Sequence, residues 1–334
     1  MIHADSISGK VFWRGEFLLG TLYRKGNSLS FSEEPEMKVE RTVIPAFFNA
    51  HTHLGDSFVM EEPVGTLPEV VGPGGFKQRM LESAEEATLL RSMATAFSHM
   101  LRTGTFGFAD FRESGVRGIS LIRKALRRNM QAIILGRPSS GDESLEHVIS
   151  MCDGLALSAI SDVDPALLDA SRDACRRMGK LFAIHFNEDR REDLELLLSL
   201  EPDFIVHGIQ CTKDEMKRLA DAGIPVAITP RSNIFYGKRP DYSAFLDSGV
   251  TLMLGTDNAM VSEPDMFSEM DFLYRYQRGL HRIGPEKIIS MATWNAYTLL
   301  GSEPRAFIVF MGDESAYDIV TRGRMRSFET FSIP

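Results

Sequence analysis

Hydrophobic residues gather along this chain in short runs that are separated by amphipathic stretches. From about residue 43 onward, eight apolar runs alternate with segments of helical periodicity. Such alternation is typical of a parallel sheet built from βαβ units. The runs lie at residues 43–50, 105–111, 131–136, 154–160, 181–186, 204–209, 225–230 and 251–256. Eight strand-and-helix repeats predict an α/β fold in which the strands close into a (β/α)8 barrel.

Helix signals fill the intervals between these runs. Residues 76–104 have the periodicity of one long helix that ends at Gly104. Asp164 followed by Pro165 is a typical helix start, and Gly223 is a typical residue just after a helix end. Two further helices are predicted around residues 266–280 and 285–300.

The two ends of the chain have a different pattern. Residues 1–42 are rich in aromatic and β-branched residues broken by turn signals, which predicts short antiparallel strands. Near the other end, the segments 306–312 (AFIVFMG) and 317–323 (YDIVTRG) also predict strands. We therefore expect a TIM-like barrel over residues 43–304. A small β domain would be formed by residues 1–42 together with 305–334.

Composition and charge narrow the classes of partner. The formal net charge of −9 and the lack of a basic patch argue against a nucleic acid or an anionic membrane surface as partner. No apolar run is long enough to span a membrane, and the first residues lack the features of a signal peptide. Three scattered cysteines, too few for a disulfide framework, suit a cytoplasmic protein. A homo-oligomer is compatible with the sequence.

Histidines stand at the ends of several predicted strands. His51 and His53 follow the first run, His185 ends the fifth and His207 ends the sixth. Asp257 follows the eighth run. A single strand-end histidine is more often a scaffold residue, but the carboxyl ends of barrel strands share one face, on which these enzymes carry their chemistry. Four imidazoles and one carboxylate there predict a site for Zn²⁺ or non-haem Fe²⁺.

Five segments resemble the successive signatures of the amidohydrolase superfamily, and within it the cytosine deaminase-like and chlorohydrolase-like branch. They are VIPAFFNAHTHLGDS, AIHFNED, IVHGIQ, TPRSN and LGTDNA. The segment ATWNAYTLLG resembles the closing helix of the family, so the resemblance runs from about Val43 to Gly301. It implies one divalent metal ion, Zn²⁺ first and Fe²⁺ as the alternative, with a water in the open position. The implied ligands are His51, His53, His185 and Asp257.

The resemblance also implies catalytic roles. Asp257 would accept a proton from the attacking water, and Glu188 would shuttle a proton between that water and the substrate. His207 would hydrogen-bond the nucleophile or the tetrahedral oxygen. The alternative for Glu188 is an exposed acid, because it lies in a run of charges that could simply face water.

Two departures from the family pattern concern the end of the fourth strand. Relatives with two metals carry a carbamylated lysine there, but the segment GLALSAISDVD contains none, and Lys180 lies just before strand five. This predicts a site with one metal. Many purine-directed relatives carry a histidine near the same position, and its absence weakens the case for an adenine nucleoside as substrate.

Candidate substrate contacts come from the loops that follow the strands. Arg137, after strand three, would hold a carboxylate, phosphate or carbonyl of the substrate, or else form a structural salt bridge. Ser232 and Asn233 match a P-x-S-N signature of the relatives and would shape the pocket wall. Residues 55–80 would form either a lid, with Phe58, Met60 and the segment GPGG, or a surface loop that packs on itself. Arg112 and Glu113 would pair with each other.

These features together favour hydrolytic deamination of an amino-substituted nitrogen heterocycle, which is a small-molecule substrate. The closest alternative is hydrolysis of a cyclic amide or of another C–N or C–halogen bond, as in imidazolonepropionase-like or chlorohydrolase-like relatives. An alternative from another class is a non-catalytic scaffold on a decayed barrel. Every ligand and the acid expected of an enzyme are present, which argues against it.

Overall fold

A parallel barrel forms the larger part of the molecule. The computed structural model describes residues 2–26, 28–139 and 144–333, and over these residues one sheet contains nine parallel strands in the order β13-β12-β11-β10-β9-β8-β7-β6-β14. The strands are β6 (Phe47–His53), β7 (Thr105–Arg112), β8 (Gln131–Gly136), β9 (Gly154–Leu157), β10 (Leu181–Phe186), β11 (Phe204–His207), β12 (Val226–Ile228), β13 (Leu252–Leu254) and β14 (Asp257–Asn258). Each of the eight predicted runs contributes a strand to this sheet. The predicted (β/α)8 barrel is confirmed.

The barrel closes through an eighth strand that is divided in two. Its first part, β13, pairs with β12, and its second part, β14, pairs with β6 at the other edge of the sheet. Between them, the Gly255 N–H donates to the carbonyl of Ile228 at 2.9 Å and the Thr256 N–H donates to that of His51 at 3.1 Å. A Cβ at Gly255 would lie 2.7 Å from the backbone nitrogen of His51, so only glycine fits at this seam.

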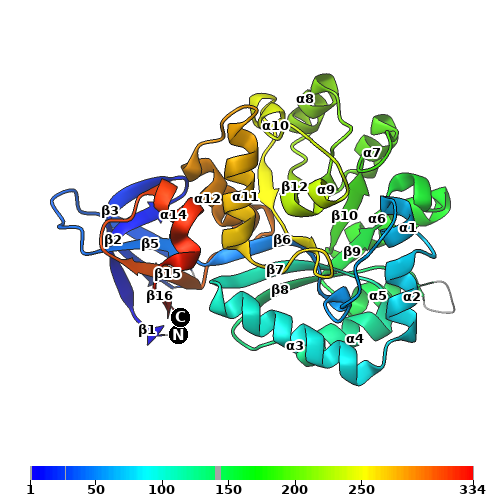
Figure 1. Cartoon of the computed structure of the whole chain (residues 1–334), viewed down its shortest axis with the longest axis horizontal. Helices are drawn as coiled ribbons and strands as arrows, with labels where there is room; N and C mark the ends of the chain where they lie inside the picture. Colours follow the sequence, from blue (N-terminus) through cyan, green and yellow to red (C-terminus); the bar gives the residue numbers. More distant parts are fainter. Residues whose placement is uncertain (1, 27, 140–143, 334) are drawn as a thin grey trace.

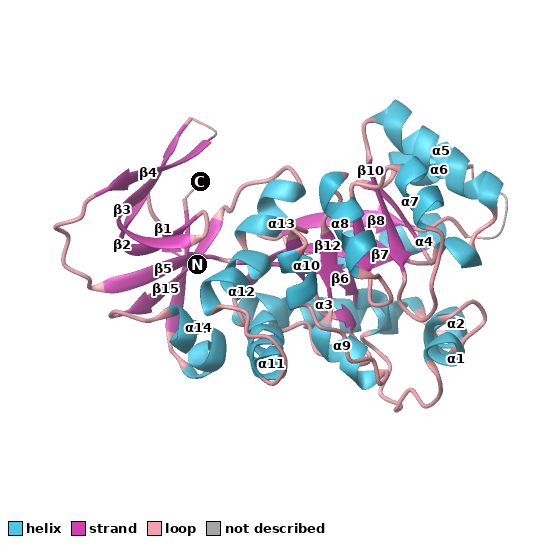
Figure 2. Ribbon diagram, turned by 90° about the horizontal axis from the view of Figure 1, so that it is seen from above, coloured by secondary structure: helices cyan, strands magenta, loops and turns pink. Residues whose placement is uncertain are grey.

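Helices cover the outside of the barrel (Figures 1 and 2). They are α1 (Leu67–Val71), α2 (Phe76–Ser83), α3 (Glu86–Arg102), α4 (Gly115–Ala125), α5 (Leu145–Ser150), α6 (Pro165–Met178), α7 (Leu194–Leu200), α8 (Lys213–Asp221), α9 (Pro230–Phe235), α10 (Ser243–Asp247), α11 (Met266–Arg278), α12 (Pro285–Ala292) and α13 (Trp294–Leu299). The α6 start is as predicted, since the Asp164 carboxylate accepts from the Ala166 N–H at 2.8 Å. The long helix predicted over 76–104 is instead two helices, because Ala84 and Glu85 are extended.

A second sheet is built from both ends of the chain. Its order is β1-β16-β15-β5-β2-β3-β4, and it lies beside the barrel with the two termini close together (Figure 1). Its strands are β1 (Ile2–His3), β2 (Ser6–Trp13), β3 (Glu16–Lys25), β4 (Ser28–Glu33), β5 (Arg41–Pro45), β15 (Ala306–Met311) and β16 (Phe328–Ser332). The apolar run at 43–50 is therefore shared: β5 pairs with β15 in this sheet, and β6 begins the barrel at Phe47.

One predicted strand near the C-terminus is wrong. Residues 317–323 do not form a strand but belong mainly to helix α14 (Ala316–Arg322). The Ser315 hydroxyl accepts a hydrogen bond from the Asp318 N–H at 3.1 Å, which caps the helix start. The buried residues Ala316, Ile319 and Val320 have helical spacing. The β-branched pair Ile319–Val320 resembles a strand only when this cap is overlooked.

Two further predictions from composition concern the membrane and the thiols. No helix in the described ranges combines the length and the apolar character that crossing a bilayer requires. The cysteines Cys152, Cys175 and Cys211 are buried and form no disulfide.

Candidate active site

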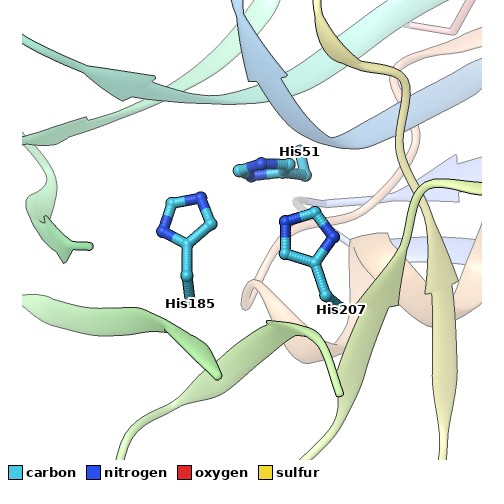
Figure 3. A group of neighbouring side chains, drawn as sticks. All are labelled: His51, His185 and His207. Atoms are coloured by element: carbon cyan, nitrogen blue, oxygen red, sulfur yellow. The ribbon is translucent and has the colours of Figure 1, made fainter. Parts of the chain in front are cut away.

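The strand-end histidines converge at one end of the barrel. Figure 3 shows the imidazoles of His51, His185 and His207 turned toward one another from the ends of β6, β10 and β11. The ring centre of His51 lies 5.1 Å from that of His185 and 5.8 Å from that of His207. His53 lies on the same side of β6, with its ring centre 4.8 Å from that of His51. All four imidazoles therefore surround a single small volume.

Asp257 completes this group from the divided eighth strand. Its Oδ1 atom lies 3.3 Å from Nε2 of His51 and 3.5 Å from Nε2 of His53. Potential ligand atoms of His51, His53 and Asp257 all lie within 4.8 Å of one another, and the same holds for His51, His185 and His207. Separations of this size between donor atoms suit one ion placed among them.

Backbone carbonyls fix the orientation of two imidazoles. Nδ1 of His185 lies 2.8 Å from the carbonyl oxygen of Leu157, and Nδ1 of His53 lies 3.0 Å from that of Phe111. A carbonyl oxygen only accepts, so Nδ1 carries the proton in both rings. Nε2 is then left with a free lone pair that faces the group, which is the arrangement a metal ligand requires.

His51 gives the most direct test of whether the group fits a metal ion. Its side chain is fully buried, and neither ring nitrogen forms a well-aligned hydrogen bond in the described part of the chain, although Nε2 lies 3.3 Å from the Asp257 carboxylate. A buried polar atom without a partner is costly and therefore rare. A divalent ion bound at Nε2 would supply a partner for that nitrogen, so the donor set fits such an ion.

The protonation states also fit. Burial lowers the pKa of His51 to about 3, against the opposing effect of Asp257. Burial likewise lowers the pKa of His53 and of His185. Burial acts to raise the pKa of Asp257, but its contact with His51 outweighs this and holds the pKa well below the ordinary value. Neutral imidazoles beside an ionised carboxylate are the states that bind a divalent cation.

Two of these residues have a strained backbone. His207 and Asp257 have φ angles of 73° and 64°, in the left-handed region that residues other than glycine seldom adopt. Such strain is common where a side chain must point into a site. It turns both side chains toward the histidine group at the points where β11 ends and β14 begins.

Glu188 lies against this group and not on a solvated face. Its Oε1 atom is 3.4 Å from Nε2 of His207, and its side chain is 15% exposed. Burial raises the pKa of Glu188 to about 7, against the opposing electrostatic effect of the nearby His207. The loop that carries it is held at both ends, because the Glu192 N–H donates to the Asn187 side-chain oxygen at 2.6 Å. The Glu192 carboxylate in turn accepts from the Asn187 N–H at 2.9 Å.

Ser232 and Asn233 are buried in α9 and do not line the cavity beside the histidines. The Ser232 hydroxyl donates to Oδ2 of Asp257 at 2.6 Å. It therefore holds the carboxylate in place from behind. The Asn233 amide donates to the Tyr242 hydroxyl at 2.9 Å, away from the histidine group.

Sequence reasoning missed a lysine that links two of the metal-ligand candidates. Nζ of Lys77 lies 2.5 Å from Oε1 of Glu113, and the same oxygen lies 2.7 Å from Nδ1 of His53. Lys77 also donates to Oδ1 of Asn258 at 2.9 Å. The Asn258 amide in turn donates to Oδ1 of Asp257 at 2.9 Å. Asn258 could have been noticed beside Asp257, but no spacing signal in the sequence marks Lys77.

The expected pair between Arg112 and Glu113 is present. Nη2 of Arg112 lies 2.5 Å from Oε2 of Glu113, and Nη1 lies 3.4 Å from Oδ1 of Asp110. All three side chains are largely buried. Glu113 therefore joins a buried charge network that supports His53 from behind, and the pair has more than a local role.

A cavity opens beside the histidine group. One part of its lining is polar and includes His185, Glu188 and Asp257. The remaining lining residues include Leu67, Pro68, Val71 and Pro73 in and after α1, and Arg137 after β8. The segment 55–80 thus reaches the cavity through α1. Met60, by contrast, is 93% exposed, and neither it nor Phe58 lines the cavity.

Comparison with known proteins places the chain in a family. Residues 42–306 match the Amidohydrolase family. A putative aminohydrolase from Archaeoglobus fulgidus is 36% identical over 285 residues, which cover 84% of this chain and 81% of that protein. A 5-methylthioadenosine/S-adenosylhomocysteine deaminase from Bacillus cereus is 24% identical over 324 residues, covering 82% of this chain and 72% of that protein.

A solved structure shares the fold. The atrazine chlorohydrolase of Arthrobacter aurescens, crystallised with zinc, has a TM-score of 0.77 at 14% identity, over 96% of this chain and 91% of that one. The match to the family model covers most of the chain and contains all of the strand ends that carry the histidines and Asp257. The chain therefore belongs to the amidohydrolase family.

Proposed function

We propose that this protein catalyses the metal-dependent hydrolytic deamination of an amino-substituted nitrogen heterocycle, with release of ammonia. The observation that carries the proposal is the place of Glu188. Its carboxyl group lies 3.4 Å from His207 at the edge of the histidine group, and burial raises its pKa to about 7. A carboxyl group with a pKa near neutrality can both take up and give back a proton. The deaminase from Bacillus cereus supports the same reaction.

The proposed metal ligands are His51, His53, His185 and Asp257, and Zn²⁺ is the first choice of ion, with Fe²⁺ as the alternative. The zinc-containing relative from Arthrobacter aurescens supports this choice. A divalent ion held there would act as a Lewis acid and lower the pKa of water toward neutrality.

Protein side chains would move the protons. Deamination adds the oxygen of water to the ring carbon and breaks the carbon–nitrogen bond of the amino group. Asp257 would accept a proton from the water, and Glu188 would pass a proton to the ring nitrogen or to the departing amine. The Thr229 hydroxyl lies 3.3 Å from Nδ1 of His207 and holds the ring in place beside the histidine group. With its proton on Nε2, His207 would donate to the oxygen that develops negative charge.

The apolar side of the cavity would bind the flat ring. Leu67, Pro68 and Val71 offer a surface without hydrogen-bonding side chains. An aromatic heterocycle that packs there leaves water, and only its amino-bearing edge has to face the polar lining. The buried free thiols suit a reducing compartment, and we place the protein in the cytoplasm.

The test is ammonia release by protein loaded separately with Zn²⁺ and with Fe²⁺. The panel contains aminopyrimidines, aminopurines and their nucleosides, aminopterins and aminotriazines. We expect metal-dependent ammonia release, lowered roughly 10²- to 10⁴-fold in Glu188→Gln. The matched control is Glu195→Gln, which changes an exposed carboxylate of α7 that pairs with Arg218 and should keep wild-type activity.

Two outcomes would contradict the proposal. Ring opening of cyclic amides or release of halide, without ammonia, would assign the site to the alternative reactions. Full activity in Glu188→Gln would remove Glu188 from the mechanism.

A further inference from the structure

We infer that Arg137 binds an oxyanion carried by the substrate, so that the substrate is a heterocycle with a carboxylate or phosphate substituent. The inference rests on the proposed function, because it names the substrate class of the same cavity. It is carried by the placement and pairing of the Arg137 side chain.

Arg137 lies in the cavity lining on a fixed backbone. It directly follows β8, its N–H donates to the carbonyl of Arg112 at 2.8 Å, and its carbonyl accepts from the Gly115 N–H at 3.2 Å. Its side chain lines the same cavity as His185 and Glu188. The guanidinium is therefore presented to the cavity from a rigid strand end.

Within the described residues this guanidinium has no protein partner. Its Nε atom is buried without a hydrogen-bond partner, and no acidic side chain in the described ranges forms an ion pair with Arg137. The other described cations of the lining are paired: Lys77 contacts Glu113 at 2.5 Å, and Arg190 contacts Asp162 at 2.6 Å. Arg137 is thus the one cation of the described lining that is open to a ligand.

The physical cost of this arrangement points to a charged ligand. Burial lowers the pKa of the Arg137 guanidinium, against the opposing charge of Glu113, which shows that the cation is poorly compensated. A charge withdrawn from water is ordinarily paired, because leaving it unpaired is costly. A carboxylate or phosphate offers two oxygens that match the guanidinium fork, whereas a neutral carbonyl brings no charge. The oxyanion is therefore the better partner.

The position of Arg137 also limits where the oxyanion sits on the substrate. β8 is separated from β10, which carries His185, by the single strand β9. Neighbouring strands lie about 4.8 Å apart, so the two strand ends are roughly 10 Å apart. Because the reacting carbon carries the amino group, the oxyanion would lie on another substituent of the ring, on the side that faces β8.

The experiment compares the binding of matched probes by calorimetric titration of the metal-loaded protein. Adenosine against adenosine 5′-monophosphate tests phosphate, and pterin against pterin-6-carboxylate tests carboxylate. Wild type is compared with Arg137→Ala, with Arg137→Lys, which keeps the charge but loses the fork, and with Arg123→Ala. Arg123 is a matched control because it lies on α4 outside the cavity, where it pairs with Asp153.

We expect the anionic member of at least one pair to bind wild type and Arg123→Ala on the order of 10- to 100-fold more tightly than the neutral member. This preference should vanish in Arg137→Ala and survive in part in Arg137→Lys. Thermal unfolding should show Arg137→Ala to be as stable as wild type, because no structural ion pair is lost. A clear loss of stability, or equal affinity of every anionic probe for wild type and Arg137→Ala, would overturn the inference.

Ammonia release measured on the same samples separates the two proposals. An anion preference that depends on Arg137 without ammonia release would leave the Arg137 site standing and refute deamination. Ammonia release without any anion preference would support deamination and refute the Arg137 site.

Discussion

At the scale of single residues, Lys77 joins two arms of the proposed metal site. It contacts Glu113 behind His53 and Asn258 beside Asp257. Groups that hydrogen-bond a metal ligand fix its orientation and strengthen its binding. Lys77 would therefore set the geometry of the site without touching the ion.

We predict that Lys77→Met weakens metal binding. Methionine keeps the apolar stem but loses both contacts, so Glu113 and Asn258 are no longer held together. Affinity for Zn²⁺, measured by competition with a chelator, should fall roughly 10- to 100-fold. The matched control is Lys124→Met, which removes an exposed lysine that pairs with Glu86 and should leave the affinity unchanged. An unaltered affinity in Lys77→Met would show that the lysine has no such role.

Residue identities in this site were predictable where the strand pattern or a family signature marked them. His51, His185, His207 and Asp257 stand next to apolar runs, so a strand assignment was enough to bring them to one face of the barrel. Lys77 starts from α2, in a long connection, and only the path of that connection carries it back to Asn258. Ser232 was marked by the family signature, yet its contact with Asp257 depends on how α9 is oriented.

At the scale of elements, the divided eighth strand determines where His51 can lie. Gly255 packs directly on the backbone of His51 where β13 ends and β14 begins, and a side chain there has no room. The backbone of β6 cannot move away without breaking its pairing with β14 and β7. Closure of the barrel and the position of the proposed ligand His51 therefore depend on the same contact.

We predict that Gly255→Ala destabilises the protein and disturbs the site together. The new Cβ would meet the His51 nitrogen at 2.7 Å, and forcing an extra group into a packed core costs about 1–3 kcal/mol or more. The free energy of unfolding measured in urea and the affinity for zinc should both fall. In the matched control Gly284→Ala, the nearest atom is 3.8 Å away on the Glu286 side chain, so little change is expected. Normal zinc affinity in Gly255→Ala would contradict the link between closure and the site.

A second element-scale prediction concerns Asp241, which ties the segment before α10 to the end of α11. Its carboxylate accepts from the Ser243 N–H at 3.0 Å and from the Gln277 amide at 2.9 Å, and lies 2.6 Å from Nδ1 of His281. Burial acts to raise the pKa of Asp241, but these hydrogen bonds outweigh it and hold the pKa below 3.8. The folded state therefore favours the ionised form.

The lowered pKa of Asp241 makes the folded state less stable at acidic pH. A carboxyl group with a lowered pKa in the folded state contributes stability that is complete above the unfolded pKa and is lost as the pH falls through the folded value. Wild type should therefore lose more unfolding free energy than Asp241→Asn when the pH is lowered from about 5 to about 3. Thermal unfolding at each pH measures this difference. Parallel pH profiles for the two proteins would contradict the role of Asp241.

Element prediction succeeded or failed according to whether the period of the pattern was unambiguous. The eight barrel runs are short, apolar and bounded by turn signals, and each contributes a strand. Residues 317–323 carry a β-branched pair on a short helix, and there the Ser315 cap decides against the strand. The helical period over 76–104 hid the break at Ala84 and Glu85, because both residues are compatible with a helix.

At the scale of the whole molecule, the two ends of the chain form one sheet, and the barrel lies beside it. β5 leads into β6 across Ala46, so the strand that carries the proposed ligands His51 and His53 starts directly from the sheet formed by the two chain ends. The Trp294 indole of α13 donates to the Phe12 carbonyl of β2 at 2.9 Å, which adds a second connection. Both sheets could be predicted from the sequence. The point where the chain passes from β5 in one sheet to β6 in the other lies inside a single apolar run, and no residue pattern marks it.

The last prediction is that the folded chain holds about one divalent ion and is stabilised by it. Three sets of side chains could each hold an ion, and every two of these sets share His51, His207 or Asp257, so they describe one site. Ser158 and Ala159 lie in the cavity lining after β9, where a bridging lysine would be needed for a second ion. Because an ion that binds only the folded state stabilises it, free metal at 100 times its dissociation constant adds about 2.7 kcal/mol. Chelation should therefore lower the melting temperature of wild type but not of His51→Ala, which has lost a ligand. Elemental analysis after dialysis counts the ions directly, and two tightly held ions per chain would mean that a donor outside this histidine group completes a second site.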